Sequence, residues 1–282
     1  MENGVANMKS SKKRHNNTII NSPLKIIKKV LLVSLYYAQS GHPGGSLSIA
    51  DILTYLYFKE MNIKDPRDPE RDRFILSKGH ACPALYAVLA LKGFITKKEL
   101  WKLRKTNALL QGHPEVGIPG IEVASGSLGQ GFSAALGIAI GAKRLNKKFR
   151  TYVILGDGEC NEGQVWEGAM FGAFHKLDNL VATVDFNNLQ SDDRCDNITA
   201  LSPLNEKWRA FGWHVIEING HDFNQIENAF KKAKTIKGKP TCIIAHTIKG
   251  KGVSFMEDNP AWHGSRGLTR DELKQALKEL RQ

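Results

Sequence analysis

Two apolar segments of the chain end in short polar motifs, and their separation limits the folds that the chain can adopt. Residues 151–158 read TYVILGDG and residues 180–188 read LVATVDFNN, so each is a strand-like run that stops at a turn. The residues between them suffice for one helix and a crossover to the next parallel strand. A right-handed crossover would place Asp157 and Asn187 together at one edge of a parallel sheet.

From about residue 20 onward, the chain alternates between helical and strand-like patterns. Amphipathic or small-residue stretches predict helices, and continuous apolar runs predict strands. The predicted helices cover residues 24–39, 47–60, 82–92, 162–176, 223–234 and 270–281, with a small-residue helix ending near 144, and the predicted strands cover 73–77, 151–155, 180–186, 213–217 and 241–247. Apolar strands separated by helices indicate an α/β protein with a doubly wound parallel sheet. Such sheets bind ligands at the carboxyl ends of their strands.

The chain is predicted to form one domain over residues 20–282, preceded by a disordered basic tail over residues 1–19. The first residues, MENGVANMKSSKKRHNN, are polar and basic and lack the apolar core of a secretory signal. A transit peptide or a nucleic-acid-binding arm is the alternative for this tail. The remainder contains no internal repeat and no linker-like stretch.

The composition indicates which class of binding partner and which cellular compartment to expect. Lysine and arginine number 40 against 28 aspartates and glutamates, and this net charge of +12 favours anionic partners. No apolar run is long enough to predict a membrane span. The cysteines Cys82, Cys160, Cys195 and Cys242 are far apart and form no CxxC pair. We therefore expect no disulfide framework, no zinc site and a cytoplasmic location.

The two motifs at the predicted sheet edge have the chemistry of a metal–diphosphate site. Asp157 offers a carboxylate and Asn187 an amide oxygen, which suit magnesium or calcium. Gly158 permits close backbone approach, and the helix after it offers free N–H groups to a diphosphate. Because magnesium usually shares its shell with phosphate oxygens, the predicted ligand is a metal–diphosphate unit. Either motif by itself would more often be a plain turn or loop.

Four of the nine histidines, His42, His80, His113 and His263, lie beside glycine or proline between predicted elements. A single histidine is usually a surface or core residue, but four in such loops indicate a site. Imidazoles donate to phosphate and hydroxyl oxygens and exchange protons near neutral pH, which suits a phosphorylated substrate with many hydroxyl groups. The glycine-rich turn ASGSLGQG at 124–131 could contact a flat heterocycle through its backbone, although such turns often only allow close packing.

With these residues in view, the sequence resembles the amino-terminal half of transketolases, and most closely the small subunit of a two-gene transketolase. The motifs SGHPGG, LSKGHACPALYA, GHPE, GIPGIEVASGSLGQG, GDGECNEGQVWEG, DFNNLQ, TIKGKGVSFME and AWHG occur in the family's order over about residues 20–265. Several thiamine diphosphate enzymes share the GDG and NN motifs, and the histidine motifs separate transketolases from the 2-oxo acid dehydrogenases. The resemblance implies the thiamine diphosphate-binding (PP-type) fold.

The resemblance also implies a role for each matched residue. Asp157, Asn187 and the backbone carbonyl of Leu189 would bind the metal, magnesium, with calcium or manganese as substitutes. The residues implied to contact thiamine diphosphate are His80, Gly126, Ser127, Leu128, Gly156, Gly158, Asn187 and His263. The residues implied in catalysis are His42, His113 and His263, which would face sugar hydroxyls, and Glu162, which would link two cofactor sites. Ser127 stands where the family often has proline, which affects loop stiffness more than backbone contacts.

The resemblance further implies that a second chain completes the enzyme. In the family, the other half supplies the glutamate that activates the aminopyrimidine and most of the arginines that hold the sugar phosphate. We therefore expect a carboxy-terminal, pyrimidine-binding partner subunit, two copies of each chain in a heterotetramer, and little activity without the partner. The expected reaction, in the pentose phosphate pathway, transfers a two-carbon ketol group from a ketose phosphate to an aldose phosphate.

The alternatives differ in how well the sequence fits them. A subunit of another thiamine diphosphate enzyme fits the histidine motifs poorly, whereas a transketolase for an unusual branched sugar phosphate fits equally well. A non-catalytic cofactor-binding protein would not need to keep Asp157, Asn187 and the four histidines. Nucleic-acid binding is disfavoured because the basic residues are spread along the chain without a recognised module. The loop SDDRCDN at 191–197 receives no role.

Overall fold

The computed structural model describes residues 2–191, 193–264 and 266–281, with side chains from residue 20 onward. The strands are β1 (Arg73–Leu76), β2 (Thr151–Gly156), β3 (Leu180–Phe186), β4 (His214–Asn219) and β5 (Thr241–His246). The helices are α1 (Glu2–Ala38), α2 (Pro43–Tyr55), α3 (Cys82–Leu91), α4 (Lys97–Leu100), α5 (Gln130–Arg144), α6 (Gly163–Phe174), α7 (Cys195–Ile198), α8 (Leu204–Ala210), α9 (Phe223–Thr235) and α10 (Arg270–Glu279). Short 3₁₀ or π turns lie at Leu56–Glu60, Gly79–Ala81, Gly158–Asn161 and Pro260–Trp262.

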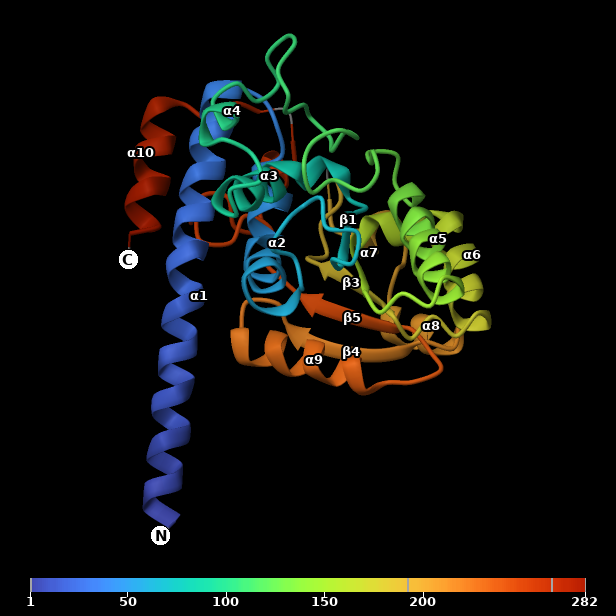
Figure 1. The fold of residues 1–282 in the computed structure, drawn as a ribbon. Coiled ribbons are helices and arrows are strands. Elements are labelled where there is room, and N and C mark those ends of the chain that lie inside the picture. Colours follow the sequence, from blue (N-terminus) through green and yellow to red (C-terminus); the bar gives the residue numbers. More distant parts are fainter. Residues whose placement is uncertain (1, 192, 265, 282) are drawn as a thin grey trace.

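The five strands form one parallel sheet in the order β1-β2-β3-β5-β4, with helices on both faces (Figure 1). The predicted doubly wound α/β fold is therefore confirmed. Strands β2 and β3 are direct neighbours, and Gly156 pairs in register with Asp185. The crossover through α6 thus brings the ends of these two strands to the same edge, as their spacing predicted.

The side chains of β2 point alternately to the two faces of the sheet, and each face has its own hydrophobic core. Tyr152 and Ile154 point into the core that the sheet shares with α1, α2, α3 and α9, whereas Val153 and Leu155 point into the core under α5, α6 and α8. All residues of β2 are buried, which explains why the strand reads as a continuous apolar run. Because both faces are covered, the open ends of the strands are left as the places where a ligand can enter.

The helix boundaries differ from the predicted ones in ways that matter for the site. Helix α2 begins at Pro43, within the segment read as a loop, because proline is well suited to the first helical position, where no backbone N–H is needed. The same helix passes into a π turn at Leu56–Glu60. The short helices α7 and α8 were not predicted, since neither is long enough to show helical periodicity.

The amino-terminal helix α1 includes most of the residues predicted to form a basic tail. The side chains of residues 1–19 lie outside the described part of the chain, so the division into tail and domain stays a prediction. None of the described helices combines the length and the apolar character needed to cross a membrane.

Candidate active site

A cavity of about 390 Å³ opens at the carboxyl edge of the sheet, where the segments after β1, β2, β3 and β5 meet the start of α2. The predicted site residues that line it are His42, His80, His113, Gly126, Leu128, Gly156, Asp157, Gly158, Glu162, Asn187, Leu189 and His263. Ser127 belongs to the same turn but is not among the lining residues. Residues that are far apart in the sequence are therefore brought to one place. Their roles, which the geometry does not test, stay predictions.

The corner between β2 and β3 places Asp157 and Asn187 next to each other. The Asp157 carboxylate accepts hydrogen bonds from the backbone N–H groups of Gly158, at 2.8 Å, and of Asn188. The Asn187 amide oxygen accepts from the N–H of Leu189 at 3.1 Å. Burial raises the pKa of Asp157 to about 6, and the charge of nearby Asp185 adds to the rise. A cation at this corner would stabilise the ionised carboxylate.

The corner offers a carboxylate and an amide oxygen, which are hard ligands suited to magnesium or calcium. The predicted third donor, the backbone carbonyl of Leu189, accepts here from the Lys249 ammonium at 2.8 Å. Across the described part of the chain, no three histidine, cysteine, aspartate or glutamate side chains cluster as a metal site would require. A metal held here would thus depend on Asp157, Asn187 and the Leu189 carbonyl, completed by oxygens of its ligand.

Beneath the corner lies an ion pair that the sequence reasoning missed. The Lys78 ammonium is 2.5 Å from Asp185 Oδ2, and both side chains are almost completely buried. Asp185 also accepts from the hydroxyl of Ser48, at 2.6 Å, and from the amide nitrogen of Asn187, at 2.9 Å. Because Asp185 engages the Asn187 nitrogen, it fixes which way the amide oxygen points. A charged residue inside the apolar run LVATVDF was the signal that could have revealed it.

Three of the four predicted histidines form a compact triangle. The ring centroids of His42, His80 and His263 lie 5.0 to 5.6 Å apart. Burial lowers the pKa of His42 to about 4 and that of His263 to about 3, and neighbouring cations and imidazoles add to both shifts. The pKa of His80 is also lowered well below its usual value, chiefly by burial. These rings are therefore uncharged at neutral pH and can each both accept and donate a hydrogen bond.

The fourth histidine, His113, is more exposed and packs against the glycine turn. A Cβ on Gly126 would lie 3.0 Å from the His113 ring. Burial, followed by the charge of Arg104, lowers the pKa of His113. Arg104 is also the strongest charged influence on the pKa of His42, so a cation lies near this part of the site.

Lys249, which the sequence reasoning also missed, reaches the cavity from the segment after β5. Its ammonium lies 2.8 Å from His263 Nδ1 and donates to the carbonyl oxygens of Leu189, at 2.8 Å, and Gln190, at 3.2 Å. Burial lowers the pKa of Lys249 to about 8, and Lys78 contributes to the shift. With its Nδ1 accepting from the ammonium, a neutral His263 carries its proton on Nε2. Lys249 thus brings to the cavity a buried ammonium group that no carboxylate of the described residues pairs with, whereas Lys78 is paired with Asp185.

The turn at 126–129 is held tightly against the strand ends. Gly126 and Gly129 have φ of +155° and +84°, which L side chains rarely adopt. The buried carboxylate of Glu159 accepts from the N–H of Gly129, at 2.7 Å, and from that of Gly156, at 3.0 Å. Glu159 therefore ties the turn to the end of β2, a role that the sequence reasoning did not assign.

Glu162 is exposed at the start of α6, where the cavity meets an open helical face. On this face Met170, Phe171 and Phe174 are 53%, 40% and 80% exposed. A groove of about 420 Å³ runs between α5 and α6, lined by Ser133, Leu136, Gly137, Gln164, Glu167, Gly168 and Phe171. We call these helices and their exposed apolar side chains the α5/α6 face.

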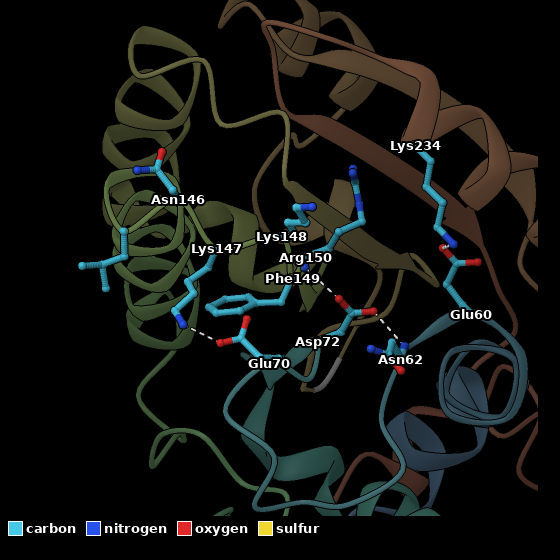
Figure 2. Close-up of a pocket in the computed structure, with 11 residues that line it drawn as sticks. Glu60, Asn62, Glu70, Asp72, Asn146, Lys147, Lys148, Phe149, Arg150 and Lys234 are labelled. Atoms are coloured by element: carbon cyan, nitrogen blue, oxygen red, sulfur yellow. Dashed lines mark hydrogen bonds and ion pairs between the residues drawn. The ribbon is translucent and has the colours of Figure 1, made fainter.

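A further cavity, of about 620 Å³, lies at the amino edge of the sheet, away from the predicted residues (Figure 2). Some of its charged side chains pair with one another: Lys234 lies 2.7 Å from Glu60 and Lys147 pairs with Glu70, while Asp72 accepts from backbone N–H groups. Lys148 and Arg150 also line it, and neither forms an ion pair with any residue that the structure describes.

The family model and the known proteins to which this chain is similar are described as transketolases. The family model described as "Transketolase, thiamine diphosphate binding domain" matches residues 21–281. The chain is 46% identical to a 6-deoxy-6-sulfo-D-fructose transketolase subunit of a Clostridium strain, covering 90% of this chain and 94% of that one. It is 42% identical to one subunit of an apulose-4-phosphate transketolase of Phocaeicola vulgatus, covering 90% of each.

The longer transketolases match over part of their length. The chain is 44% identical to the transketolase of Homo sapiens over 86% of this chain and 39% of that one. Among solved structures, a transketolase of Campylobacter jejuni superposes with a TM-score of 0.85 at 32% identity, covering 92% of this chain and 43% of that one. A transketolase of Pichia stipitis in complex with a sedoheptulose phosphate gives 0.86 at 32% identity, covering 92% and 40%. The chain thus spans about two fifths of these solved proteins.

Proposed function

The chain belongs to the transketolase family, in which it is a thiamine diphosphate-binding domain, and from this premise we propose that it is the amino-terminal subunit of a two-chain transketolase. The observation that carries the proposal is one cavity that joins an oxygen-rich corner, two buried lysines and four histidines. With its partner, the enzyme would transfer a two-carbon ketol group from a ketose phosphate to an aldose phosphate.

The corner of Asp157, Asn187 and the Leu189 carbonyl would hold the metal, which we propose is magnesium. Support comes from the oxygen donor set and from the buried carboxylate, whose raised pKa a cation would reverse. Calcium or manganese would be functional substitutes, since both accept oxygen ligands.

The diphosphate would lie between this metal and the two buried ammonium groups, Lys78 and Lys249. Gly156 and Gly158 leave room for the phosphates beside the backbone, and His80 and His263 can donate to their oxygens. The turn from Gly126 through Ser127 to Leu128 would contact the aminopyrimidine through backbone groups, since its left-handed glycines present N–H and C=O groups without side chains in the way.

When bound, thiamine diphosphate supplies the nucleophilic carbon and the electron sink of ketol transfer. The chain's own part would be to bind the diphosphate, orient the sugar and move protons. His42, His113 and His263 would face the sugar hydroxyls. A neutral imidazole of His42 or His113 would accept a hydroxyl proton as the carbon–carbon bond breaks and return it to the acceptor oxygen after the new bond forms, whereas His263, whose Nδ1 already accepts from Lys249, would donate through Nε2. The lowered pKa values of His42 and His113 support their role, because they keep the basic form available.

A partner chain with the pyrimidine-binding half would cover the open side of the cavity. The subunit names of the relatives support a second chain. We propose that the α5/α6 face is buried in a heterotetramer of two such chains and two partners, where Glu162 would link the two cofactor sites. The four cysteines are free and buried, which is consistent with our proposal of a cytoplasmic enzyme.

A transketolase for an unusual sugar is the second candidate. Two relatives that the chain matches over nearly their whole length are named for a sulfonated fructose and for apulose phosphate. Both names include an anionic group, a sulfonate or a phosphate, which the partner's half would contact. The cofactor cavity would then be unchanged between the two candidates.

The deciding experiment combines the purified chain with the product of a co-transcribed reading frame that encodes a pyrimidine-binding half. With magnesium and thiamine diphosphate, the mixture should convert xylulose and ribose phosphates to sedoheptulose and glyceraldehyde phosphates, whereas neither chain alone should. Activity only with sulfofructose or apulose phosphate would select the second candidate. Full activity of this chain alone would contradict the two-chain proposal.

A further inference from the structure

His221 lies outside the cavity, in the turn between β4 and α9, yet both of its ring nitrogens face polar groups. Nε2 accepts a hydrogen bond from the backbone N–H of Ile248 at 2.9 Å. Nδ1 lies 3.4 Å from Asp51 Oδ2, an oxygen that is also 2.9 Å from the Lys28 ammonium. Because Nε2 is an acceptor, the neutral ring carries its proton on Nδ1, where it faces the carboxylate.

This arrangement is closed to solvent and joins separate elements. The side chains of Lys28 on α1, Asp51 on α2 and His221 after β4 are only 8%, 7% and 11% exposed. Burial alone would raise the pKa of the Asp51 carboxyl, but Lys28 and His221 together hold it below its usual value. The ionised carboxylate faces Nδ1 from 3.4 Å, which is too far for a well-formed hydrogen bond, so it favours a proton on Nδ1 by its charge.

The backbone N–H that donates to His221 belongs to Ile248, the residue directly before Lys249. Three N–H groups of this segment donate as the chain leaves β5: that of Thr247 to Phe186 O at 3.1 Å, that of Ile248 to His221, and that of Gly250 to Gly44 O at 3.0 Å. The Thr247 hydroxyl also donates to Asp185, and the Lys249 carbonyl accepts from the N–H of Asp258 at 3.0 Å. Of the three N–H groups, only that of Ile248 donates to a side chain. It is the contact that fixes the backbone on the amino-terminal side of Lys249, whereas Gly44 and Asp258 hold the backbone at and after the lysine.

We propose that His221 is a positioning residue for Lys249: through the Ile248 N–H it fixes the backbone from which the Lys249 ammonium enters the cofactor cavity. The ammonium meets His263 Nδ1 and Leu189 O at 2.8 Å each, so a small shift of its backbone would break both contacts. The bond from the Ile248 N–H is partly buried, so without its acceptor the segment would move to let this N–H reach water or another acceptor. The consequence for cofactor binding rests on the function proposed above for Lys249.

The first test needs no cofactor and uses the full chain. His221→Leu removes the acceptor, whereas His221→Gln can place an amide oxygen near the position of Nε2. Hydrogen exchange in the segment 247–250 should become about tenfold faster in His221→Leu and return close to wild type in His221→Gln. The control is His246→Leu, because His246 is an exposed histidine on the adjacent strand end. Unchanged exchange in this segment, or an equal rise throughout the sheet, would overturn the proposal.

The second test measures the Kd of thiamine diphosphate by calorimetry, with magnesium and the partner chain present. His221→Leu should weaken binding about tenfold, and His221→Gln should bind close to wild type. The double variant with Lys249→Met should bind no more weakly than Lys249→Met alone, since His221 acts through the lysine. Additive losses would contradict the positioning role. If Lys249→Met itself left the Kd unchanged, the proposed function of the lysine would fail, and the exchange result would still decide the role of His221.

Discussion

The two edges of the sheet each carry a cavity, and the edges differ in how deeply their lysines are buried. At the amino edge the lysines that form ion pairs in the larger cavity are partly solvated: Lys234, 2.7 Å from Glu60, and Lys147, which pairs with Glu70, are 44% and 40% exposed (Figure 2). At the carboxyl edge the smaller cavity buries Lys249 among neutral acceptors, and within the described part of the chain no carboxylate lies within ion-pair distance of it. Cavity size therefore does not separate the two edges, whereas a buried ammonium without a carboxylate partner does, and a ligand of opposite charge would stabilise it.

The largest expected effect tests the carboxylates of the two edges against each other. Asp157 and Asp72 are both buried, and each accepts from two backbone N–H groups. Asp157→Asn should weaken magnesium-dependent binding of thiamine diphosphate by about a hundredfold or more, because the amide cannot replace the charged metal ligand. Calorimetric titration with the partner chain present would measure it.

Asp72→Asn is the matched control. It should lower the free energy of unfolding by about 1 to 2 kcal/mol, since charged acceptors make the stronger hydrogen bonds, and should leave the Kd of the cofactor unchanged. Equal losses of cofactor binding in the two variants would show that the comparison between the edges is wrong.

The next effect compares two lysines. Lys249→Met should weaken cofactor binding about tenfold or more, because an ammonium without a carboxylate partner is free to bind phosphate oxygens. Lys234→Met, which removes the partner of Glu60, should leave cofactor binding within about twofold of wild type. The comparison requires the Kd of both variants under identical salt, and a stronger effect of Lys234→Met would reverse our assignment of the functional edge.

A smaller effect separates binding from turnover at the carboxyl edge. His113→Ala should lower kcat by about a hundredfold with little change in the Kd of the cofactor, since the proposed task of His113 is a proton transfer at the sugar. His246→Ala, at an exposed position on β5, should leave both quantities unchanged. Steady-state kinetics on the two-chain enzyme would measure kcat, and a loss confined to cofactor binding would contradict the placement of His113.

The smallest effect belongs to the amino edge. The Lys147 and Glu70 side chains are 40% and 53% exposed, so their ion pair is largely solvated. Lys147→Ala should change the free energy of unfolding by less than about 1 kcal/mol and should not affect activity. Chemical denaturation would measure the change, and a loss of several kcal/mol would mean that this edge is more than a neutralised surface.

The fold and the location of the site could be predicted because they depend on local patterns. Apolar runs gave the strands, and the crossover rule alone brought Asp157 and Asn187 together at neighbouring strand ends. Glycine-flanked histidines marked the loops that meet there. These signals are carried by residue types within short windows of the sequence, so they require no knowledge of distant contacts.

The ionisable residues beneath the site could not be predicted in the same way. Lys78 and Lys249 are two of the chain's many basic residues, and only the tertiary structure buries their ammonium groups at one cavity. Glu159 lies in a motif whose second glutamate, Glu162, drew attention instead, yet it is Glu159 that holds the glycine turn. Asp185 was detectable in principle, since a carboxylate in a buried strand needs partners.

The triangle of His42, His80 and His263 has a consequence for how the protein tolerates acid. Each ring has a lower pKa in the folded chain than a histidine has in the unfolded chain. Between about pH 6.5 and pH 4, these histidines are therefore protonated in the unfolded chain but stay neutral in the folded chain. Stability from these rings is complete above pH 6.5 and is lost as the pH falls. Mild acid should therefore loosen the reaction centre before it unfolds the remainder, and a bound anion, by offsetting the lysines, should delay that loss.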